Sequence, residues 1–431
     1  MKEPPGQYLP SAAEALPAWS ADAPQQNVYL QATDGAVSHG ILYRPAGNPG
    51  VKVCCYVMHP RGPMSRHYLA GYLPERGMAV FGHDGRYLNN DIDCLHERLL
   101  LDVAAGMRFL RDAGYETIIG VGNSGGGSLF GYYQEQAERQ PRDRRNAAPS
   151  GDPVDLAGAD MSPFDLYVGL AAHPGQGNYL LQALDPSVVD EGDPQSWDAS
   201  LDMYFEPNGY RRWPEPSTYA EDWLNGYREA QQQRCRKLDA IAREAIADRG
   251  LARALAGHTG TEALTGTHRD RLRRRAKLWR YMVIYRTLAN PAYLDPASDP
   301  SNRPIGSIFA AGQDPFNTNY GTGGLARIMT PRGWLSTWSG LSSYANLYET
   351  IRGVSVPTLI LSADGDMDIY PGQQQTIFDN AGAADKTLED LACADHYLNP
   401  VGPEAADLAH PRVRAADRIV EWARARNAGV D

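Results

Sequence analysis

Short apolar segments alternate with longer amphipathic ones along much of this chain, and that alternation constrains the fold more than any other feature of the sequence. In the first part of the chain, the apolar segments lie at residues 51–59, 78–84, 117–122 and 164–173. The segments between them suit helices, and residues 96–114 have the clearest helical period, ending on Gly114 as a C-cap. Apolar strands that alternate with helices and are joined by short loops form a parallel sheet with helices on both faces. The sequence therefore predicts an α/β fold.

Other segments complete the predicted sheet and its helices. Residues 28–45 contain two β-rich runs around a Thr-Asp-Gly turn, which predicts an antiparallel hairpin. Residues 65–77 suit a helix. Late in the chain we expect strands at 356–364 and 386–392 and a final amphipathic helix at 412–427.

A long interruption separates the two parts of this pattern. About 170 residues precede the strand at 356–364 without strand alternation. They predict a long helix over 217–250, with Ser217 as N-cap and Glu221 in its first turn, and a basic helix over 268–290. A segment of this length between two core strands is typical of an inserted lid or cap. We therefore expect an N-terminal arm (1–27), a core (28–176 and 351–431) and a mainly helical cap (177–350).

Charge and composition narrow the class of protein. The chain has 431 residues, of which 42% are hydrophobic, and a formal net charge of −11. An acidic balance of this size argues against nucleic acid or an anionic membrane surface as the main partner. No stretch approaches the roughly 18 apolar residues that cross a bilayer, and the N-terminus lacks the apolar core of a signal peptide. We expect a soluble, cytoplasmic protein that acts on a small molecule.

The cysteines indicate neither a disulfide framework nor a metal site. There are five, an odd number, and none forms a Cys-x-x-Cys pair. Cys54 and Cys55 are adjacent in an apolar strand, so we expect their side chains to be buried on opposite faces of the sheet. The sequence predicts no cofactor and no metal.

The glycine-rich turn around Ser124 is the strongest functional signal. Gly122-Asn123-Ser124-Gly125-Gly126 matches Gly-x-Ser-x-Gly, follows a predicted strand and precedes a segment that suits a helix. A serine in a sharp turn between strand and helix presents its hydroxyl above the sheet, and side chains two residues away on either side would collide. A phosphate-binding loop would need a Lys-Ser/Thr ending, which is missing here. Ser124 is therefore a candidate nucleophile.

A serine hydroxyl needs a base, and the base needs an orienting acid, in the chain order Ser, acid, His. Only His396 and His410 follow the strand at 356–364, and His396, in a loop after a strand, is the better candidate because His410 lies at a helix start. The acid should come from Asp364, Asp366 or Asp368. Their spacing resembles a calcium loop, but Ile369 and Gln375 stand where that loop needs Gly and Glu. Asp366 lies five residues after Leu361, which is where the acid is expected after this strand, so it is the first candidate. Asp364 stays open as the alternative.

Acyl transfer also needs N–H donors for the oxyanion. The N–H of Gly125, at the start of the expected helix, is one candidate. The second should come from the loop His59-Pro60-Arg61-Gly62, and because proline has no N–H, Arg61 is the candidate through its backbone. The Arg61 side chain could hold a substrate carboxylate or be solvated.

Strand order, the Gly-Asn-Ser-Gly-Gly turn, the His-Pro-Arg-Gly loop, the late acid and the Asp-His-Tyr histidine loop together resemble the α/β-hydrolase superfamily. The resemblance covers residues 28–176 and 351–431. It implies the α/β-hydrolase fold, with an eight-stranded, mostly parallel sheet, and a triad of Ser124, Asp366 and His396. The chain departs from the usual pattern at Pro60, which replaces a glycine, and in the length of the inserted segment.

The leading hypothesis is a serine hydrolase of carboxylic esters or lactones that works through an acyl-enzyme. Many aromatic residues lie in the inserted segment, which favours a bulky, hydrophobic or ring-bearing substrate. Two alternatives remain: a carbon–carbon bond hydrolase or acyltransferase that uses the same triad, and a non-catalytic binding protein on the same scaffold.

Three further features of the sequence carry expectations. His173, at the end of a core strand, should lie near the mouth of the site, where bracing its loop is favoured over touching substrate. The cations from Arg269 to Arg280 should form a solvated helix face paired with carboxylates. A stripe on the same segment could serve as a homodimer surface. It consists of Leu272, Ala276, Leu278, Tyr281 and Met282.

Overall fold

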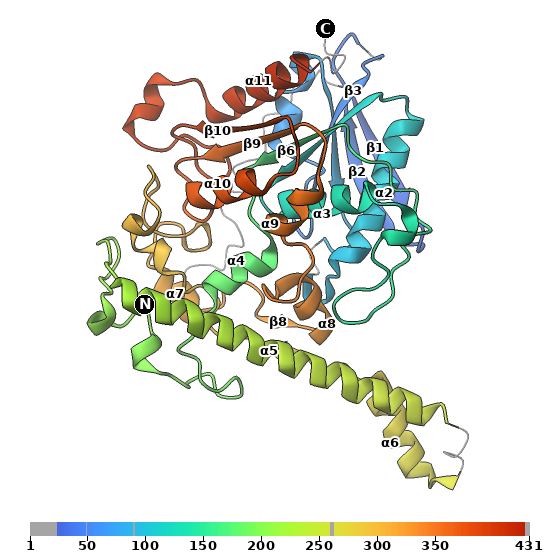
Figure 1. The fold of residues 1–431 in the computed structure, drawn as a ribbon, viewed down its shortest axis with the longest axis vertical. Helices are drawn as coiled ribbons and strands as arrows, with labels where there is room; N and C mark the ends of the chain where they lie inside the picture. Colours follow the sequence, from blue (N-terminus) through green and yellow to red (C-terminus); the bar gives the residue numbers. More distant parts are fainter. Residues whose placement is uncertain (1–23, 49, 89–90, 259–262, 427–431) are drawn as a thin grey trace.

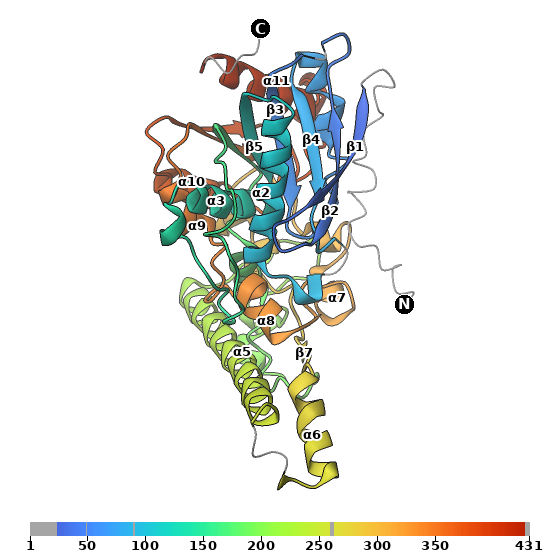
Figure 2. The same ribbon diagram turned by 90° about the vertical axis from the view of Figure 1, so that its right-hand side faces the viewer.

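The computed structural model describes residues 24–48, 50–88, 91–258 and 263–426, and an eight-stranded sheet runs through it (Figures 1 and 2). The strand order is β1-β2-β4-β3-β5-β6-β9-β10. All neighbouring pairs from β4 to β10 are parallel, while β2 is antiparallel to both β1 and β4. The predicted mostly parallel sheet is therefore confirmed. The strands are β1 (Gln25–Gln31), β2 (Val37–Tyr43), β3 (Val53–His59), β4 (Ala79–Asp84), β5 (Thr117–Asn123), β6 (Leu166–Leu170), β9 (Thr358–Ala363) and β10 (Lys386–Leu391).

The predicted hairpin is β1 and β2, which turn at Gly35 with a φ of 85°. β1 begins at Gln25, within the stretch assigned to the N-terminal arm, so that assignment was wrong for residues 25–27. The rest of the arm, except residue 24, lies outside the described residues.

Helices cover both faces of the sheet, as the alternation predicted. On one face lie α2 (His96–Asp112), α3 (Gly125–Ala137), α9 (Leu347–Thr350) and α10 (Pro371–Asn380), and on the other lies α11 (Pro411–Arg424). Cys54 and Cys55 are fully buried, one in the core on each face, as expected from their adjacency in β3.

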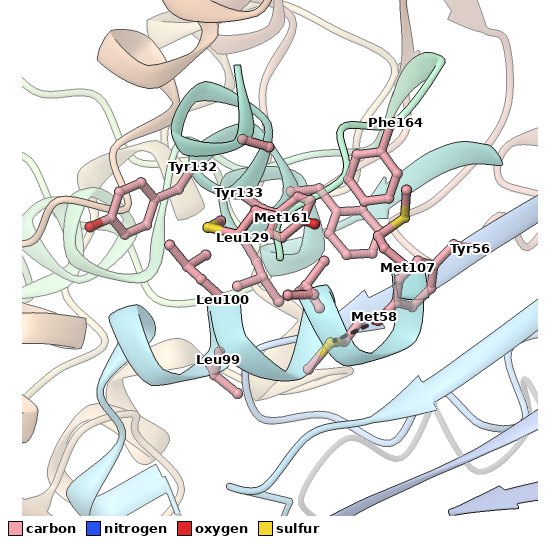
Figure 3. Close-up of a cluster of buried hydrophobic side chains, with 14 of the residues drawn as sticks. Tyr56, Met58, Leu99, Leu100, Met107, Leu129, Tyr132, Tyr133, Met161 and Phe164 are labelled. Carbon is pink, nitrogen blue, oxygen red and sulfur yellow. Dashed lines mark hydrogen bonds between the residues drawn. The ribbon is translucent and has the colours of Figure 1, made fainter. Parts of the chain in front are cut away.

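Figure 3 shows part of the core between the sheet, α2 and α3. Leu100 and Met107 of α2 and Leu129 of α3 belong to this core, and Tyr56 of β3 and Phe164 pack with their ring centroids 6.0 Å apart. These side chains are almost completely buried. Each contributes about 1.5–3 kcal/mol by leaving water, which fixes α3 and the turn before it on the sheet.

The helix predicted over residues 65–77 is wrong. The segment forms two short 3₁₀ turns, Tyr68–Gly71 and Pro74–Arg76. Pro74 has no N–H to continue a helix, and Gly77 ends the second turn with a φ of 85°.

The segment between β6 and β9 lies at one end of the sheet, with α5 extending across it and α6 beside the far end of α5 (Figure 1). We call residues 177–350 the inserted segment. Two buried clusters hold it together, one around Trp334 and Trp338, which also includes Ile369 of the core, and one around Tyr227 and Tyr293. Besides short 3₁₀ turns, it contains most of α4 (Gln176–Ala183), α5 (Glu221–Ala256), α6 (Gly266–Lys277), β7 (Met282–Val283), α7 (Pro315–Tyr320), β8 (Ile328–Met329), α8 (Pro331–Gly333), a π-helical turn (Trp334–Trp338) and α9.

Two details of the predicted helices in this segment were wrong. The N-cap of α5 is Ala220, not Ser217, whose buried hydroxyl instead accepts from the N–H of Arg211 at 2.9 Å; Glu221 is in the first turn as predicted. The basic helix ends at Lys277 instead of residue 290 because the apolar run after it is extended, with Met282 and Val283 in β7 paired to β8.

Because α6 ends at Lys277, the apolar stripe predicted as a possible homodimer surface does not lie on a single helix. Ala276 is in the helix and buried, Leu278 and Tyr281 are exposed beyond the helix, and Met282 is buried in β7. The stripe is therefore not one helix face. The cations of α6 are exposed, and Arg275 pairs with Asp248 as expected of a solvated face.

Within the described residues, no helix is both long and apolar enough to cross a membrane.

Candidate active site

Ser124 occupies the sharp turn between β5 and α3. Its backbone has φ 54° and ψ −125°, a conformation that costs a non-glycine residue about 1–3 kcal/mol. Hydrogen bonds to the neighbouring chain hold it there. The N–H of Ser124 donates to the carbonyl of Leu170 at 3.1 Å, and the carbonyl of Ser124 accepts from the N–H of His173 at 3.2 Å. The turn thus has the strained geometry that the sequence predicted.

The glycines around Ser124 permit close backbone approach. A Cβ on Gly122 would lie 2.5 Å from Cα of Gly127, and a Cβ on Gly126 would lie 2.3 Å from the carbonyl oxygen of Met58. Both contacts are with backbone atoms, which cannot move aside as a flexible side chain would. Any other residue at these positions would push α3 away from β3 and β5.

Asn123 braces the same turn. Its side-chain amide donates to the carbonyl of Leu170 at 2.9 Å, and its oxygen accepts from Nε2 of His67 at 3.2 Å. Burial lowers the pKa of His67 to about 4, so this imidazole is neutral near pH 7.

Ser124, His396 and Asp366 form one chain of hydrogen bonds. Nδ1 of His396 lies 2.6 Å from Oδ2 of Asp366, and Nε2 of His396 lies 2.9 Å from Oγ of Ser124. Since a carboxylate only accepts, Nδ1 carries the proton, and in the neutral ring Nε2 accepts from the serine hydroxyl. His396 and Asp366 are 3% and 1% exposed, so water does not compete for these bonds.

The Asp366 carboxylate is held by its own loop. Its other oxygen, Oδ1, accepts from the N–H groups of Asp368 at 2.9 Å and Ile369 at 3.0 Å. Burial alone would lower the pKa of His396, but the charge and hydrogen bond of Asp366 outweigh burial and raise it above its usual value.

The two alternatives considered in the sequence lie elsewhere. Asp364 accepts from the amide of Asn302 at 2.6 Å and from the N–H of Ala394 at 3.4 Å. His410 caps α11, where its ring accepts from the N–H of Arg412 at 3.2 Å. The structure thus brings Asp366 and His396, and neither of these alternatives, to Ser124.

Ser124 opens into a pocket between the core and the inserted segment, with a volume of about 40 Å³. Part of its wall is polar and comprises His59, Arg61, His173, Gln176, Asp368 and His396. The rest is mainly apolar and comprises Tyr179, Ile308, Phe309, Leu325, Trp338 and Ile369. Burial raises the pKa of the Tyr179 phenol well above its usual value, so it carries its proton.

The two candidate oxyanion donors differ in their surroundings. Gly125 begins α3, where the N–H groups of the first turn have no partner within the helix. The N–H of Arg61 instead donates to Nδ1 of His59 at 3.2 Å. The Arg61 guanidinium lines the pocket and lies 5.2 Å from the ring centroid of Trp338, which is a cation–π contact.

His173 lines the pocket, as expected from its place after a core strand. Its ring also braces the loop, since Nδ1 accepts from the N–H of Gly175 at 3.0 Å. Sequence reasoning did not assign pocket roles to the side chains of His59, Gln176 and Tyr179. His59 is the last residue of β3, and Gln176 begins α4 three residues after His173, so position at the ends of strands was the available signal.

Asp368 is a second buried carboxyl group in the acid loop. It accepts from the hydroxyls of Tyr179 at 2.5 Å and Ser307 at 3.0 Å and from the N–H of Ile308 at 2.7 Å. Burial, followed by the charge of Asp366, raises its pKa to about 6. Asp368 therefore joins the acid loop to the inserted segment.

Among the described residues, no group of three or more His, Cys, Asp or Glu side chains is arranged to hold a metal ion.

The raised pKa of Asp368 predicts a particular dependence of stability on pH. The folded protein keeps this proton up to about pH 6, whereas the unfolded chain releases it near the ordinary value of 3.8. The contribution to stability is therefore present below pH 4 and is lost as the pH rises to 6. Asp368→Asn should remove this slope, so the difference in free energy of unfolding between wild type and variant should change by about 2–3 kcal/mol from pH 4 to 7. Urea titrations across this range measure the difference, and parallel curves would contradict the assignment.

No protein-family model matches the sequence, and no curated protein matches it. Among solved structures, a hypothetical protein from Pseudomonas aeruginosa is 14% identical over 97% of this chain and 98% of its own, with a TM-score of 0.46. An α/β hydrolase from Penicillium sp. sh18 is 12% identical over 86% and 91%, with a TM-score of 0.45. The esterase domain of a Rhodothermus marinus protein is 11% identical over 93% and 98%, with a TM-score of 0.40.

The fold itself is established by the architecture of the chain. Two antiparallel pairings lead into a parallel sheet, and a serine in a strained turn ends β5 where the following helix begins. The residues that approach this serine follow β9 and β10, in the order acid and then histidine. This topology and this turn are what the sequence resemblance implied, and the chain is an α/β-hydrolase-fold protein.

Proposed function

We propose that this protein is a serine hydrolase that cleaves carboxylic esters or lactones through an acyl-enzyme. The observation that carries the proposal is the buried chain of hydrogen bonds from Ser124 Oγ through His396 to Asp366. A buried base bonded to a serine hydroxyl on one side and to a carboxylate on the other is the arrangement that activates serine at neutral pH.

The reaction follows from the direction of these bonds. Ser124 Oγ attacks the carbonyl carbon of the substrate while Nε2 of His396 takes the hydroxyl proton. Asp366 keeps Nδ1 protonated and stabilises the imidazolium that results. His396 then gives the proton to the leaving alcohol, and a water molecule repeats the sequence on the acyl-enzyme. The N–H of Gly125 and the positive end of α3 stabilise the oxyanion in both steps.

The substrate class is proposed from the apolar side of the pocket. Ile308, Phe309 and Trp338 offer an aliphatic and aromatic surface to a hydrophobic or ring-bearing acyl group. We assign the inserted segment the role of a cap over this pocket. Because the pocket volume is only about 40 Å³, a ring-bearing group requires residues of the cap, such as Phe309, to move aside.

Loss of the Ser124 hydroxyl tests the proposal directly. Ser124→Ala should lower kcat/KM for p-nitrophenyl acetate by a factor of about 10⁴ or more and abolish labelling by a fluorophosphonate, because no nucleophile remains. Ser128→Ala is a matched control. The Ser128 hydroxyl is buried in α3 and donates to the carbonyl of Gly125 at 3.1 Å, so this variant should still be labelled. Labelling of Ser124→Ala at the wild-type rate would refute the assignment.

The raised pKa of His396 sets the pH dependence. Acylation needs unprotonated His396, so kcat/KM should rise with pH along a limb whose midpoint lies above 6.5. Asp366→Asn removes the charge that raises this pKa. The limb, followed as the rate of fluorophosphonate labelling, should move to lower pH, and kcat should fall by about 10⁴. Asp417→Asn, which alters a carboxylate half-exposed on α11 and paired with Arg76, should leave the profile unchanged; a profile equally unchanged in Asp366→Asn would contradict the role of Asp366.

A smaller side chain at position 309 tests the role of the cap. Phe309→Ala should raise the ratio of kcat/KM for p-nitrophenyl benzoate over the acetate by about tenfold, because the added space admits a ring. Phe316→Ala changes an exposed phenylalanine of the same segment and should leave the ratio within twofold. An unchanged ratio in Phe309→Ala would show that this side chain does not limit the acyl group.

A further inference from the structure

Three side-chain nitrogen atoms crowd the space beside Gly125, next to the serine. A Cβ on Gly125 would lie 2.5 Å from Nε2 of Gln176, 2.6 Å from Nε2 of His59 and 3.0 Å from Nε2 of His173. The three nitrogens therefore converge within 3.0 Å of one point, a single bond length from Cα of Gly125. All three residues line the pocket that contains Ser124 and His396.

The backbone fixes the tautomer of His59. Its Nδ1 accepts from the N–H of Gly62 at 2.8 Å and from the N–H of Arg61 at 3.2 Å. A nitrogen that accepts from an N–H carries no proton, so in the neutral ring the proton is on Nε2. The loop His59-Pro60-Arg61-Gly62 thus bends back on the imidazole and turns its Nε2–H into a donor that faces Gly125.

The tautomer of His173 is fixed in the same way. Its Nδ1 accepts from the N–H of Gly175 at 3.0 Å, which again leaves the proton on Nε2. Among the described residues, neither Nε2 has a hydrogen-bond partner. Burial lowers the pKa of both rings, well below the usual value for His59 and to about 3 for His173, so both are neutral donors at the pH of catalysis.

We propose that the Nε2–H groups of His59 and His173, assisted by the amide of Gln176, donate to the oxyanion and replace the N–H of Arg61 as partners of the Gly125 N–H. This inference rests on the proposed serine hydrolase function and adds side-chain donors to it. The three nitrogens lie beside the residue that follows the serine, in the pocket that contains Ser124, so N–H groups there can reach an oxygen that gains negative charge when the serine attacks.

The neutral state of these rings suits that role. In the transition state His396 becomes an imidazolium beside the same pocket, and a second positive ring there would oppose its formation. Neutral N–H donors stabilise the oxyanion without adding such a charge. They are also held by backbone N–H groups before substrate binds, which is the preorganisation that makes donors effective in a buried site.

Paired substitutions at each histidine test the proposal. Glutamine can place an N–H near the position of Nε2, whereas leucine cannot donate. His59→Leu and His173→Leu should each lower kcat for p-nitrophenyl acetate by about 10²–10³ with KM changed less than threefold. His59→Gln and His173→Gln should each retain kcat to within about tenfold of wild type. His39→Gln, on β2 outside the pocket, is the control for replacing a histidine and should keep wild-type activity.

The outcomes separate this inference from the proposed function. If wild type is labelled at Ser124 by a fluorophosphonate but folded leucine variants keep kcat within threefold, the donors are overturned and the serine hydrolase stands. A rise in KM with kcat unchanged would likewise overturn the oxyanion role. If Ser124 in wild type is not labelled and no ester is cleaved, the proposed function fails and this inference fails with it.

A second measurement uses the wild-type chain, in case a leucine variant does not fold. Proton–nitrogen NMR of protein with ¹⁵N-labelled histidine should show His59 and His173 protonated on Nε2, with assignments from the two glutamine variants. Both Nε2–H signals should move downfield when Ser124 carries a phosphonate whose oxygen occupies the oxyanion position. Signals that do not move in the adduct, or protons found on Nδ1, would refute the proposal.

Discussion

The backbone of Ser124 is the constraint on which the rest of the site depends. A serine with φ 54° is unfavourable by itself, and it persists because the surrounding chain offers no relaxed alternative. Leu170 and His173 hold its N–H and carbonyl, while Gly122 and Gly126 let β3, β5 and α3 approach within side-chain distance. A change of the Ser124 backbone to a relaxed conformation would break its hydrogen bonds to Leu170 and His173. It would also separate α3 from β3 and β5. The sheet therefore fixes the position of the hydroxyl, and the loop after β10 needs only to place the His396 ring beside it.

The loop after β9 carries two buried carboxyl groups, two residues apart, that have different partners. Asp366 faces His396, and Asp368 faces Tyr179, Ser307 and Ile308 beside the pocket. The two groups are connected, because the N–H of Asp368 donates to the Asp366 carboxylate. A displacement of residues 307–308 would remove donors from a buried carboxyl group and disturb the backbone that orients the acid. The inserted segment thus contributes to the order of the acid loop as well as to the wall of the pocket.

Local patterns predicted the sheet, the turn at Ser124 and the pair formed by Asp366 and His396, because strand alternation and the positions of residues after strands are visible in a sequence. They failed where a tertiary contact or a single residue determines the local conformation. The segment at 65–77 has helical spacing but contains Pro74, and the run after Lys277 has apolar residues that pair as β7 instead of continuing α6. Ser217 resembled a cap, yet its hydroxyl bonds to a distant turn. The roles of His59 and Gln176 depend on side-chain directions, which residue type and spacing do not specify.

The imidazoles that line the pocket show how one type of side chain takes opposite roles. Nδ1 of His396 meets a carboxylate, which requires a proton on Nδ1 and leaves Nε2 as a base with a raised pKa. Nδ1 of His59 and of His173 meets backbone N–H groups, which requires the proton on Nε2 and leaves a neutral donor. Since all three rings lie around Ser124, their chemistry cannot be read from residue type or burial. In the proposed mechanism, the partner of Nδ1 decides whether each ring takes a proton from the serine or donates a hydrogen bond to the oxyanion.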